Sequence, residues 1–382
     1  MKDLSDSRVL IVDDVKGNID ILVEALKDDY KLSVALDGSA ALRSVEKTAP
    51  DLVLLDIMMP GMDGYEVCRQ LRARESTREL PVMFLSALED VTNKAQGFEV
   101  GGNDYLTKPF EVLEVKARVR SLLKAKAYAD AVREAMARDL RIAREIQMGI
   151  LPADLPSATK GTGLDIHAVI EPARQVGGDL YEVLRVSDDR VVVALGDVSG
   201  KGIPSALFMA VAVTVLRTLA RQITEPDEIL RRLNDELVEQ NPRGMFVTLQ
   251  CLVFDLANRR VLCAGAGHHQ LAILSPGKEP RLACPSSGRP VGLMPCNPIT
   301  YEALPLQPGE TFVLFSDGVS EAMNREENFY GEERLLATLA TVSDAPPAEL
   351  VARVLADVRA FAAGAQQSDD ITVLAARYRV QS

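Results

Sequence analysis

Residues 111–151 constrain the fold more strongly than any other segment, because they contain no proline and a single glycine near their end. The segment is rich in Ala, Leu, Arg, Glu and Lys, which are good helix formers. We therefore expect one long helix here. The chain of 382 residues is too long for one ordinary core, so we expect a domain on each side of this helix. The expected parts are a first domain at 1–125, a helical linker at 111–151 that continues its last helix, and a second domain at 152–382.

Apolar residues recur along this helix at steps of three and four, which predicts an apolar stripe on one side. The stripe consists of Val115, Val119, Leu122, Ala125, Ala129, Val132, Met136, Leu140 and Ala143. A two-stranded coiled coil would bury it, and we favour this arrangement, which makes the chain a homodimer. The alternative is a helix that packs on its own domain, and the small alanine side chains in the stripe agree with that alternative. Pro152 and Pro156 end the helix.

The first third of the chain alternates short apolar runs with segments of helical spacing. The runs are continuous at 9–12, 52–55 and 82–85, as in strands that are buried on both faces of a parallel sheet. Helical spacing follows at 18–27 and at 64–74. This alternation predicts a doubly wound α/β domain, in which ligands bind beyond the carboxyl ends of the strands.

Acidic side chains stand at those predicted strand ends. Asp13 and Asp14 follow the first run, Asp56 follows the second, Ser86 the third, and Lys108 ends the short run DYLT. Clustered carboxylates repel one another unless a cation neutralises them, and their hard oxygen atoms suit Mg²⁺. Asp56 is then the best-placed nucleophile for a phosphoryl group, whose oxygens Lys108 and Ser86 would contact. Any single Asp here could instead be solvated or cap the next helix.

These motifs, DD at 13–14, LLDIMMPGMDG at 54–64, LSA at 85–87 and DYLTKPF at 104–110, resemble the receiver domain of two-component response regulators over about residues 5–125. The resemblance implies a flavodoxin-like fold, a bound Mg²⁺, a sensor histidine kinase as partner and a cis bond before Pro109. It assigns Asp56 as phosphoacceptor, Asp13, Asp14, Asp56 and the Met58 carbonyl as Mg²⁺ ligands, Ser86 and Lys108 as switch residues, and Tyr105 as the aromatic side chain that changes rotamer.

Beyond residue 163 the pattern becomes antiparallel. Runs at 180–186 and 190–196 flank a short SDD turn, and runs at 247–256 and 259–266 flank AN, so each pair is expected to form a hairpin. Amphipathic helical patterns lie between the strand groups, at 203–222, 227–239, 331–342 and 347–363. We infer an α+β core with sheets flanked by helices.

A second set of acidic residues gathers at the ends of apolar runs. It comprises Asp179 in VGGDLY, Asp197 in LGDVSGKG, Asp317 in LFSDGVSEA, and Asp369 and Asp370 in SDDITVL. Glycine stands beside the carboxylate in three of the motifs, which leaves room for backbone and water. Oxygen ligands alone indicate Mg²⁺ or Mn²⁺, and two such ions can activate water for direct hydrolysis of a phosphate. The alternative for each motif alone is an ordinary turn.

Composition excludes several other classes of protein. Lys and Arg total 43 against 55 Asp and Glu, a net charge of −12, which argues against binding of nucleic acid or anionic membrane. There is no signal-like N-terminus and no stretch of roughly 18 uncharged apolar residues, so we expect a cytoplasmic protein. The five cysteines are spaced for neither a disulfide framework nor a zinc site. His167, His268 and His269 are too few and too badly spaced for zinc and are expected to be structural.

Seven motifs resemble the metal-dependent protein phosphatases, also called protein phosphatase 2C (PP2C), and specifically the bacterial branch that acts on anti-sigma factor antagonists. They are AREIQMGILP at 143–152, VGGDLYE at 176–182, GDVSGKGIPSALFMA at 196–210, MFVTLQCLVFD at 245–255, AGAGHH at 264–269, FSDGVSEAMN at 315–324 and QSDDITVL at 367–374. The resemblance covers about residues 140–380.

This second resemblance implies an αββα sandwich, two Mn²⁺ or Mg²⁺ ions, and a phosphoserine or phosphothreonine protein as substrate, namely a phosphorylated anti-sigma factor antagonist. It assigns Asp179, Asp197, the Val198 carbonyl, Asp317 and Asp369 as metal ligands, with Gly178 and Asp370 in support. Glu182 stands where relatives often have Asp, and the phosphate-binding Arg of eukaryotic relatives is missing. The group that orients the phosphate is therefore unassigned.

Two other functions compete with this one. Some receiver proteins end in a phosphatase-like domain that has lost its metal carboxylates and acts as an adaptor. Every ligand position here keeps its Asp, which favours the enzyme. A DNA-binding regulator would need a basic C-terminal face, which residues 331–382 do not offer. We further expect phosphorylation of Asp56 to act through the helix by repositioning the AREIQ segment against the phosphatase sheets.

Overall fold

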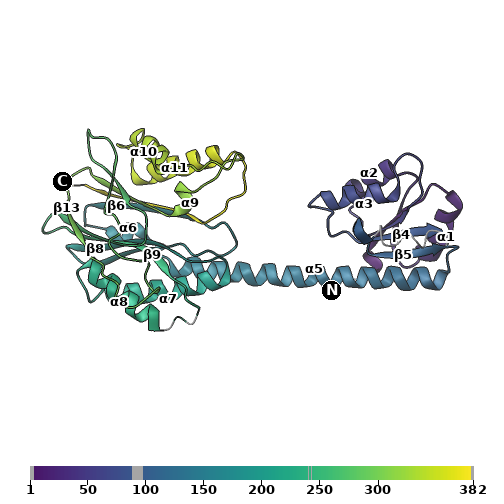
Figure 1. Ribbon diagram of the computed structural model, residues 1–382, viewed down its shortest axis with the longest axis horizontal. Coiled ribbons are helices and arrows are strands. Elements are labelled where there is room, and N and C mark those ends of the chain that lie inside the picture. The colour runs from purple at the N-terminus through teal and green to yellow at the C-terminus, as the bar shows by residue number, and fades with distance from the viewer. Residues whose placement is uncertain (1–3, 88–97, 240, 242, 380–382) are drawn as a thin grey trace. The chain divides into compact units, whose positions relative to one another are not determined.

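The computed structural model describes residues 4–87, 98–239, 241 and 243–379. Contacts within the chain divide it into two compact units, Met1–Arg138 and Asp139–Ser382. Helix α5 (Val112–Ile150) begins in the first unit and ends in the second, so the predicted long helix connects the two (Figure 1).

The first unit contains a parallel sheet of five strands in the order β2-β1-β3-β4-β5. The strands are β1 (Arg8–Val12), β2 (Lys31–Ala35), β3 (Leu52–Asp56), β4 (Val82–Ala87) and β5 (Asp104–Lys108). Its described helices, besides the start of α5, are the short 3-10 helix η1 (Leu4–Asp6), α1 (Lys16–Leu26), α2 (Gly38–Thr48) and α3 (Gly64–Ala73). This flavodoxin-like order confirms the predicted doubly wound fold.

Helices cover both faces of this sheet because its strands are apolar on both sides. On one face, Leu10 and Phe84 pack with residues of α2 and α3 such as Leu71. On the other face, Ile11 packs with α1 and with Val119 in the first turns of α5. The carboxyl ends of the strands therefore meet at one edge, between two rigid layers.

The apolar stripe of α5 divides into two parts. Val115 and Val119 are fully buried against the parallel sheet of the first unit, and Leu123 and the partly buried Leu122 pack on the same core. Further along, Val132 is 41% exposed and Met136 is 62% exposed. The helix thus packs on its own domain at its start, and the exposed part of the stripe is the part that remains for the predicted coiled coil.

The second unit contains two antiparallel sheets, each of five strands, in the orders β13-β10-β9-β8-β7 and β12-β11-β14-β15-β6. The first is made of β7 (Leu180–Ser187), β8 (Arg190–Val198), β9 (Val247–Asp255), β10 (Arg260–Ala266) and β13 (Glu302–Pro305). The second is made of β6 (Leu164–Glu171), β11 (Leu271–Leu274), β12 (Arg281–Ala283), β14 (Thr311–Phe315) and β15 (Ile371–Tyr378). Both predicted hairpins, β7 with β8 and β9 with β10, are confirmed.

Helices cover the outer faces of both sheets, so that the unit has four layers in the order expected for an αββα sandwich (Figure 1). The helices α7 (Ile203–Ala220) and α8 (Pro226–Glu239) lie on the first sheet, whereas α10 (Glu332–Ala340) and α11 (Pro347–Ala362) lie on the second. Two short helices, α6 (Leu155–Thr159) and α9 (Asp317–Ser320), complete the described part of the unit. Side chains such as Phe254 and Phe312 fill the space between the sheets, their rings 5.5 Å apart.

One helix among the described residues is long and apolar enough to cross a membrane, judged by length and composition alone. This helix is α7, with a mean hydropathy of 1.8 over 18 residues, although it contains the charged Arg217. Met209, Val213 and Leu216 of α7 are buried in the core of the unit. One face of α7 thus packs on β7, β8 and α8, whereas Leu207 and Val211 are exposed on the other.

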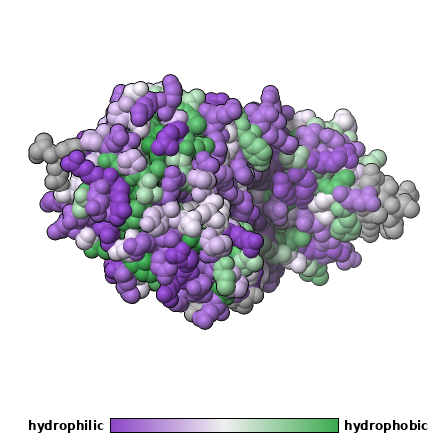
Figure 2. Space-filling view, turned by 60° about the vertical axis from the view of Figure 1, so that its left-hand side comes forward, coloured by the Kyte–Doolittle hydropathy of each residue, from purple (hydrophilic) through white to green (hydrophobic). Residues whose placement is uncertain are grey.

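The surface agrees with the acidic composition of the chain. Figure 2 shows hydrophilic residues over most of the visible face, with small apolar patches between them. Such scattered apolar residues are normal on a folded surface and do not by themselves indicate an interface.

Candidate active site

The parallel sheet of the first unit brings the predicted receiver residues to one edge. Asp13 follows β1, Asp56 ends β3, Ser86 lies near the end of β4, and Lys108 ends β5. The Lys108 Nζ atom lies 2.8 Å from Asp13 Oδ2 and 2.9 Å from Asp56 Oδ1. Ligand atoms of Asp13, Asp14 and Asp56 all lie within 4.8 Å of one another, which is compact enough for one divalent cation.

Electrostatics at this edge favour a bound cation. Asp13 and Asp56 are buried, and burial raises the pKa of Asp56 while Lys108 acts in the opposite direction. The Ser86 hydroxyl is buried and finds no hydrogen-bond partner among the described residues. An orphaned hydroxyl beside Asp56 and Lys108 is placed to bind a phosphoryl oxygen.

The other two predicted receiver residues differ in exposure. Tyr105 is buried, with its ring 5.4 Å from that of Phe84 and 5.1 Å from that of Phe98. Met58, whose carbonyl is the predicted ligand, is 70% exposed. The peptide bond between Lys108 and Pro109 is cis, as expected.

The second unit brings its predicted carboxylates to one end of the two stacked sheets. Asp179 directly precedes β7, and Asp197 lies at the end of the neighbouring strand β8. Asp317 follows β14 and begins α9, while Asp369 and Asp370 precede β15, which pairs with β14. Each sheet therefore supplies two strand ends, and residues far apart in the sequence meet there.

Hydrogen bonds across the two sheets hold this end together. The Thr372 hydroxyl of β15 donates to Asp179 Oδ2. Asp370 accepts from the backbone N–H groups of Gly178, at 2.7 Å, and of Ala173, at 2.8 Å. Asp370 thus ties the loop that carries Asp179 to the second sheet, in agreement with its predicted supporting role.

Gly178 leaves space that any side chain would fill. A Cβ atom at this position would lie 2.6 Å from the Val198 carbonyl oxygen and 3.0 Å from Asp197 Oδ1. Both of these oxygens are predicted metal ligands. Glycine at 178 therefore lets the backbone approach two of the predicted ligands more closely than any side chain would allow.

Mutual repulsion and burial act on these carboxylates together. Burial and then the charge of Asp197 raise the pKa of Asp179, which is only 1% exposed. Burial, followed by the charges of Asp317 and Asp369, raises the pKa of Asp197 to about 7. Within the part of the chain that the structure describes, Asp179 Oδ1 and Asp317 Oδ1 are buried without a hydrogen-bond partner. Buried acceptors of this kind fit divalent cations.

A lysine also lies at this end. Lys201 Nζ is 2.9 Å from Asp369 Oδ2 and donates to the Ser368 carbonyl at 2.5 Å. Among the described residues, only the receiver triad has three ligand atoms within 4.8 Å of one another, so the phosphatase carboxylates are more widely spread.

Residues 187–379 match the family described as Stage II sporulation protein E (SpoIIE), a match over half of the 382-residue chain. The chain belongs to the SpoIIE family. Residues 9–120 match the response regulator receiver domain. The protein is therefore a response regulator in which a receiver domain is joined to a PP2C-like phosphatase domain of the SpoIIE type.

Similar proteins match different parts of this SpoIIE-family chain. It is 42% identical over 170 residues to "Response regulator PleD" of Caulobacter vibrioides, and the aligned region covers 44% of this chain and 36% of PleD. It is 31% identical over 265 residues to "Protein IcfG" of Synechocystis sp., and the aligned region covers 62% of this chain and 41% of IcfG. The solved SiaA-PP2C domain of Pseudomonas aeruginosa superposes with a TM-score of 0.59 at 25% identity, over 66% of this chain and 99% of that chain.

His268, which the sequence predicted to be structural, supports the SpoIIE-type site in a way that its spacing did not show. His268 is buried between the sheets, with Nδ1 2.9 Å from the Thr248 hydroxyl and Nε2 3.1 Å from the Phe315 carbonyl. Thr248 pairs with Asp197 across β8 and β9, and Phe315 stands two residues before Asp317. Burial lowers the pKa of His268 to about 3, so the ring is neutral and bridges the two strand ends.

The end of α5 is also fixed to this site. Gln147 is buried, and its amide donates to the Gly177 carbonyl at 2.6 Å and accepts from the Gly177 N–H at 3.2 Å. Arg217 joins the same region by donating to the Ile150 carbonyl at 2.8 Å and to Glu182 at 2.7 Å. Glu182, the noted departure from relatives, therefore pairs with a core arginine and not with the carboxylate end.

Proposed function

We propose that this response regulator removes phosphate from phosphoserine or phosphothreonine of a partner protein, and that the partner is an anti-sigma factor antagonist. One observation carries the reaction: four aspartates from two sheets meet at one end of the unit, and two of their buried oxygens have no hydrogen-bond partner among the described residues. The choice of substrate rests on the seven motifs between 143 and 374, which resemble the phosphatases that act on such antagonists.

The roles of the site residues follow from their positions. Asp179, Asp197, the Val198 carbonyl, Asp317 and Asp369 would hold two Mn²⁺ or Mg²⁺ ions, which when bound lower the pKa of water and offset phosphate charge. Thr372 and Asp370 fix the loop of Asp179, and His268 fixes the strand ends of Asp197 and Asp317. Lys201 brings a positive charge to this end, where it would orient the phosphate in place of the missing arginine.

The receiver would control this reaction. Asp56 accepts a phosphoryl group from a histidine kinase, with Lys108 and Ser86 at its oxygens and Asp13, Asp14 and the Met58 carbonyl around Mg²⁺. The conformational change would travel along α5, whose last turns bond to Gly177 through Gln147, two residues before Asp179. Val132 and Met136 are exposed on the same helix and would pair in a homodimer.

Removal of the phosphoacceptor is expected to abolish regulation without abolishing activity. In the wild type, a phosphoryl mimic bound at Asp56 should change turnover with Mn²⁺ about tenfold, which needs only about 1.4 kcal/mol of coupling. In Asp56→Ala the same mimic should change nothing, whereas the exposed control Asp20→Ala should respond like the wild type. Equal turnover with and without the mimic in all three proteins would show that the receiver does not control the phosphatase.

The pKa of Asp197 predicts a pH-dependent response to metal. Because its folded pKa of about 7 lies above its ordinary value of 3.8, ionisation of Asp197 destabilises the fold as pH rises between these values. A divalent cation favours the ionised form, so Mn²⁺ should raise the melting temperature more at pH 8 than at pH 5. A ligand at a concentration of about 100 times its Kd adds about 2.7 kcal/mol to the free energy of unfolding, which raises the melting temperature by several degrees.

Calorimetric melts with Mn²⁺ and with a chelator, at both pH values, measure this effect. The variant Asp197→Asn carries no titratable group at this position and should lose the difference between the two pH values. A shift of equal size at pH 5 and pH 8 in the wild type would contradict the assignment of Asp197 as a ligand.

A further inference from the structure

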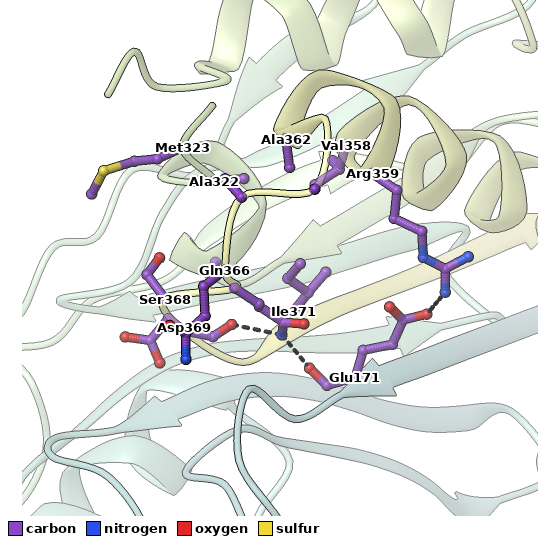
Figure 3. A pocket seen from close by; sticks show the side chains of 14 residues that line it. Glu171, Ala322, Met323, Val358, Arg359, Ala362, Gln366, Ser368, Asp369 and Ile371 are labelled. Atoms are coloured by element: carbon purple, nitrogen blue, oxygen red, sulfur yellow. Dashed lines mark hydrogen bonds and ion pairs between the residues drawn. The ribbon is translucent and has the colours of Figure 1, made fainter. Parts of the chain in front are cut away.

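A pocket of about 230 Å³ opens in the phosphatase unit beside the carboxylate end. Its walls come from the end of β6, from α9 and the residues after it, from the last turns of α11, and from the loop at 364–369 that leads into β15 (Figure 3). The end of β6 and the α9 segment are far in the sequence from α11 and the loop that follows it, and the fold brings them together.

The pocket shares residues with the proposed active site. Asp369 is a predicted metal ligand and also lines the pocket, and Gly318, which directly follows Asp317, lines it too. Figure 3 shows Asp369 at one side of the pocket and the Glu171 and Arg359 side chains at the other. A phosphoprotein bound with its phosphate at the carboxylates would therefore place neighbouring residues at this opening.

The lining shows which kind of side chain would fit. Ala322, Val358, Ala362 and Ile371 supply apolar surface. Several polar groups of the wall are already engaged: Arg359 pairs with Glu171, and the Gln367 amide donates to the Glu171 and Asp369 carbonyls, each at 2.8 Å. A polar or charged side chain would gain little from such groups and would lose its water.

The volume of the pocket further limits which groups it can bind. Pockets for whole small molecules usually measure about 300–1,000 Å³, and this one is smaller. It is large enough for one aliphatic side chain such as that of Leu, Ile or Met. The mouth is bordered by the partly exposed Met323, whose flexible thioether can adapt to different apolar partners.

We propose that this pocket binds an aliphatic side chain of the phosphoprotein substrate, next to the phosphorylated residue, and thereby selects the sequence that is dephosphorylated. The proposal rests on the proposed phosphatase function and adds the specificity site to it. The pocket contributes to binding of the protein substrate and not to the chemical step. It should therefore affect KM for a phosphoprotein and leave kcat unchanged.

The proposal is tested by a substitution that fills the pocket with a larger side chain. In Ala362→Phe, the added ring should raise KM for a serine-phosphorylated anti-sigma antagonist, or its phosphopeptide, at least about tenfold, the size expected for a lost apolar contact. Turnover of p-nitrophenyl phosphate, which has no flanking residues, should stay unchanged. Ala352→Phe, on an exposed position of the same helix and outside the pocket, is the matched control and should behave like the wild type.

A second measurement keeps the proposal testable if Ala362→Phe folds poorly. Phosphopeptides in which each flanking aliphatic residue is changed to Ser are assayed with the wild type, and one position should raise KM about tenfold. If no position does so, or if Ala362→Phe leaves KM for the phosphoprotein unchanged, the pocket is not the specificity site. If the wild type hydrolyses neither p-nitrophenyl phosphate nor the phosphoprotein, the phosphatase function itself fails and the pocket proposal falls with it.

Discussion

Asp197→Ala is expected to lower Mn²⁺-dependent turnover about a thousandfold. Asp197 lies close enough to the other carboxylates that the charges of Asp317 and Asp369 raise its pKa and its own charge raises the pKa of Asp179. Loss of its oxygens would remove ligands that both ions need, and metal ions contribute several kcal/mol to such reactions. Since about 1.4 kcal/mol of transition-state stabilisation corresponds to a factor of ten in rate, the loss of several kcal/mol gives the thousandfold fall in turnover.

The measurement is phosphate release with saturating Mn²⁺, and it needs a control in the same hairpin. Asp188→Ala changes an aspartate in the turn between β7 and β8, where the side chain is 96% exposed and pairs only with Arg185. This control should keep wild-type turnover. Asp317→Ala should behave like Asp197→Ala. If Asp197→Ala kept turnover within twofold of the wild type, the ligand assignment would be wrong.

Gly178→Ala is expected to weaken Mn²⁺ binding, and with it turnover, by about ten- to a hundredfold. The added methyl group would lie 2.6 Å from the Val198 carbonyl oxygen and 3.0 Å from Asp197 Oδ1, too close for either ligand to keep its place. Displacement of groups that orient metal ligands typically costs this much in affinity. Every carboxylate remains in this variant, so the effect would come from geometry alone.

Isothermal titration with Mn²⁺ measures the affinity directly, together with turnover at several Mn²⁺ concentrations. Gly149→Ala is the matched control, since a Cβ there meets nothing within 4 Å. High Mn²⁺ should restore part of the turnover in Gly178→Ala, because the ligands are displaced and not removed. Wild-type affinity in this variant would exclude the Val198 carbonyl and Asp197 as neighbouring ligands.

The sequence alone predicts the fold and the clustering of the site residues well, for a physical reason. Continuous apolar runs define buried strands, and polar residues at their ends lie at the sheet edge. This places Asp13 beside Asp56 at the ends of parallel strands, and Asp179, before one strand of a hairpin, beside Asp197 at the end of the other. Helix α5 was equally predictable because nothing in 111–151 interrupts it. Steps of three and of four from Val119 lead to Leu122 and to Leu123 alike, and both pack on the core, Leu123 the more deeply.

Residues that depend on distant partners could not be predicted. His268 is important because Thr248 and the Phe315 carbonyl lie on either side of it, and no spacing in the sequence shows this. Gln147 is part of the AREIQ motif, yet its bonds to Gly177 depend on how the helix end docks on the sheet. The pocket at Asp369 is hidden in the same way, because its walls come from four separate segments.

The central claim is that the carboxylate end of the two sheets hydrolyses a phosphoprotein. The most direct test is the rate of phosphate release from a serine-phosphorylated anti-sigma antagonist with Mn²⁺, compared between the wild type and Asp197→Ala. We predict rapid release by the wild type, none with a chelator, and about a thousandfold less by the variant. Tight binding of the antagonist by both proteins, with no phosphate released by either, would contradict the claim and identify the domain as an adaptor.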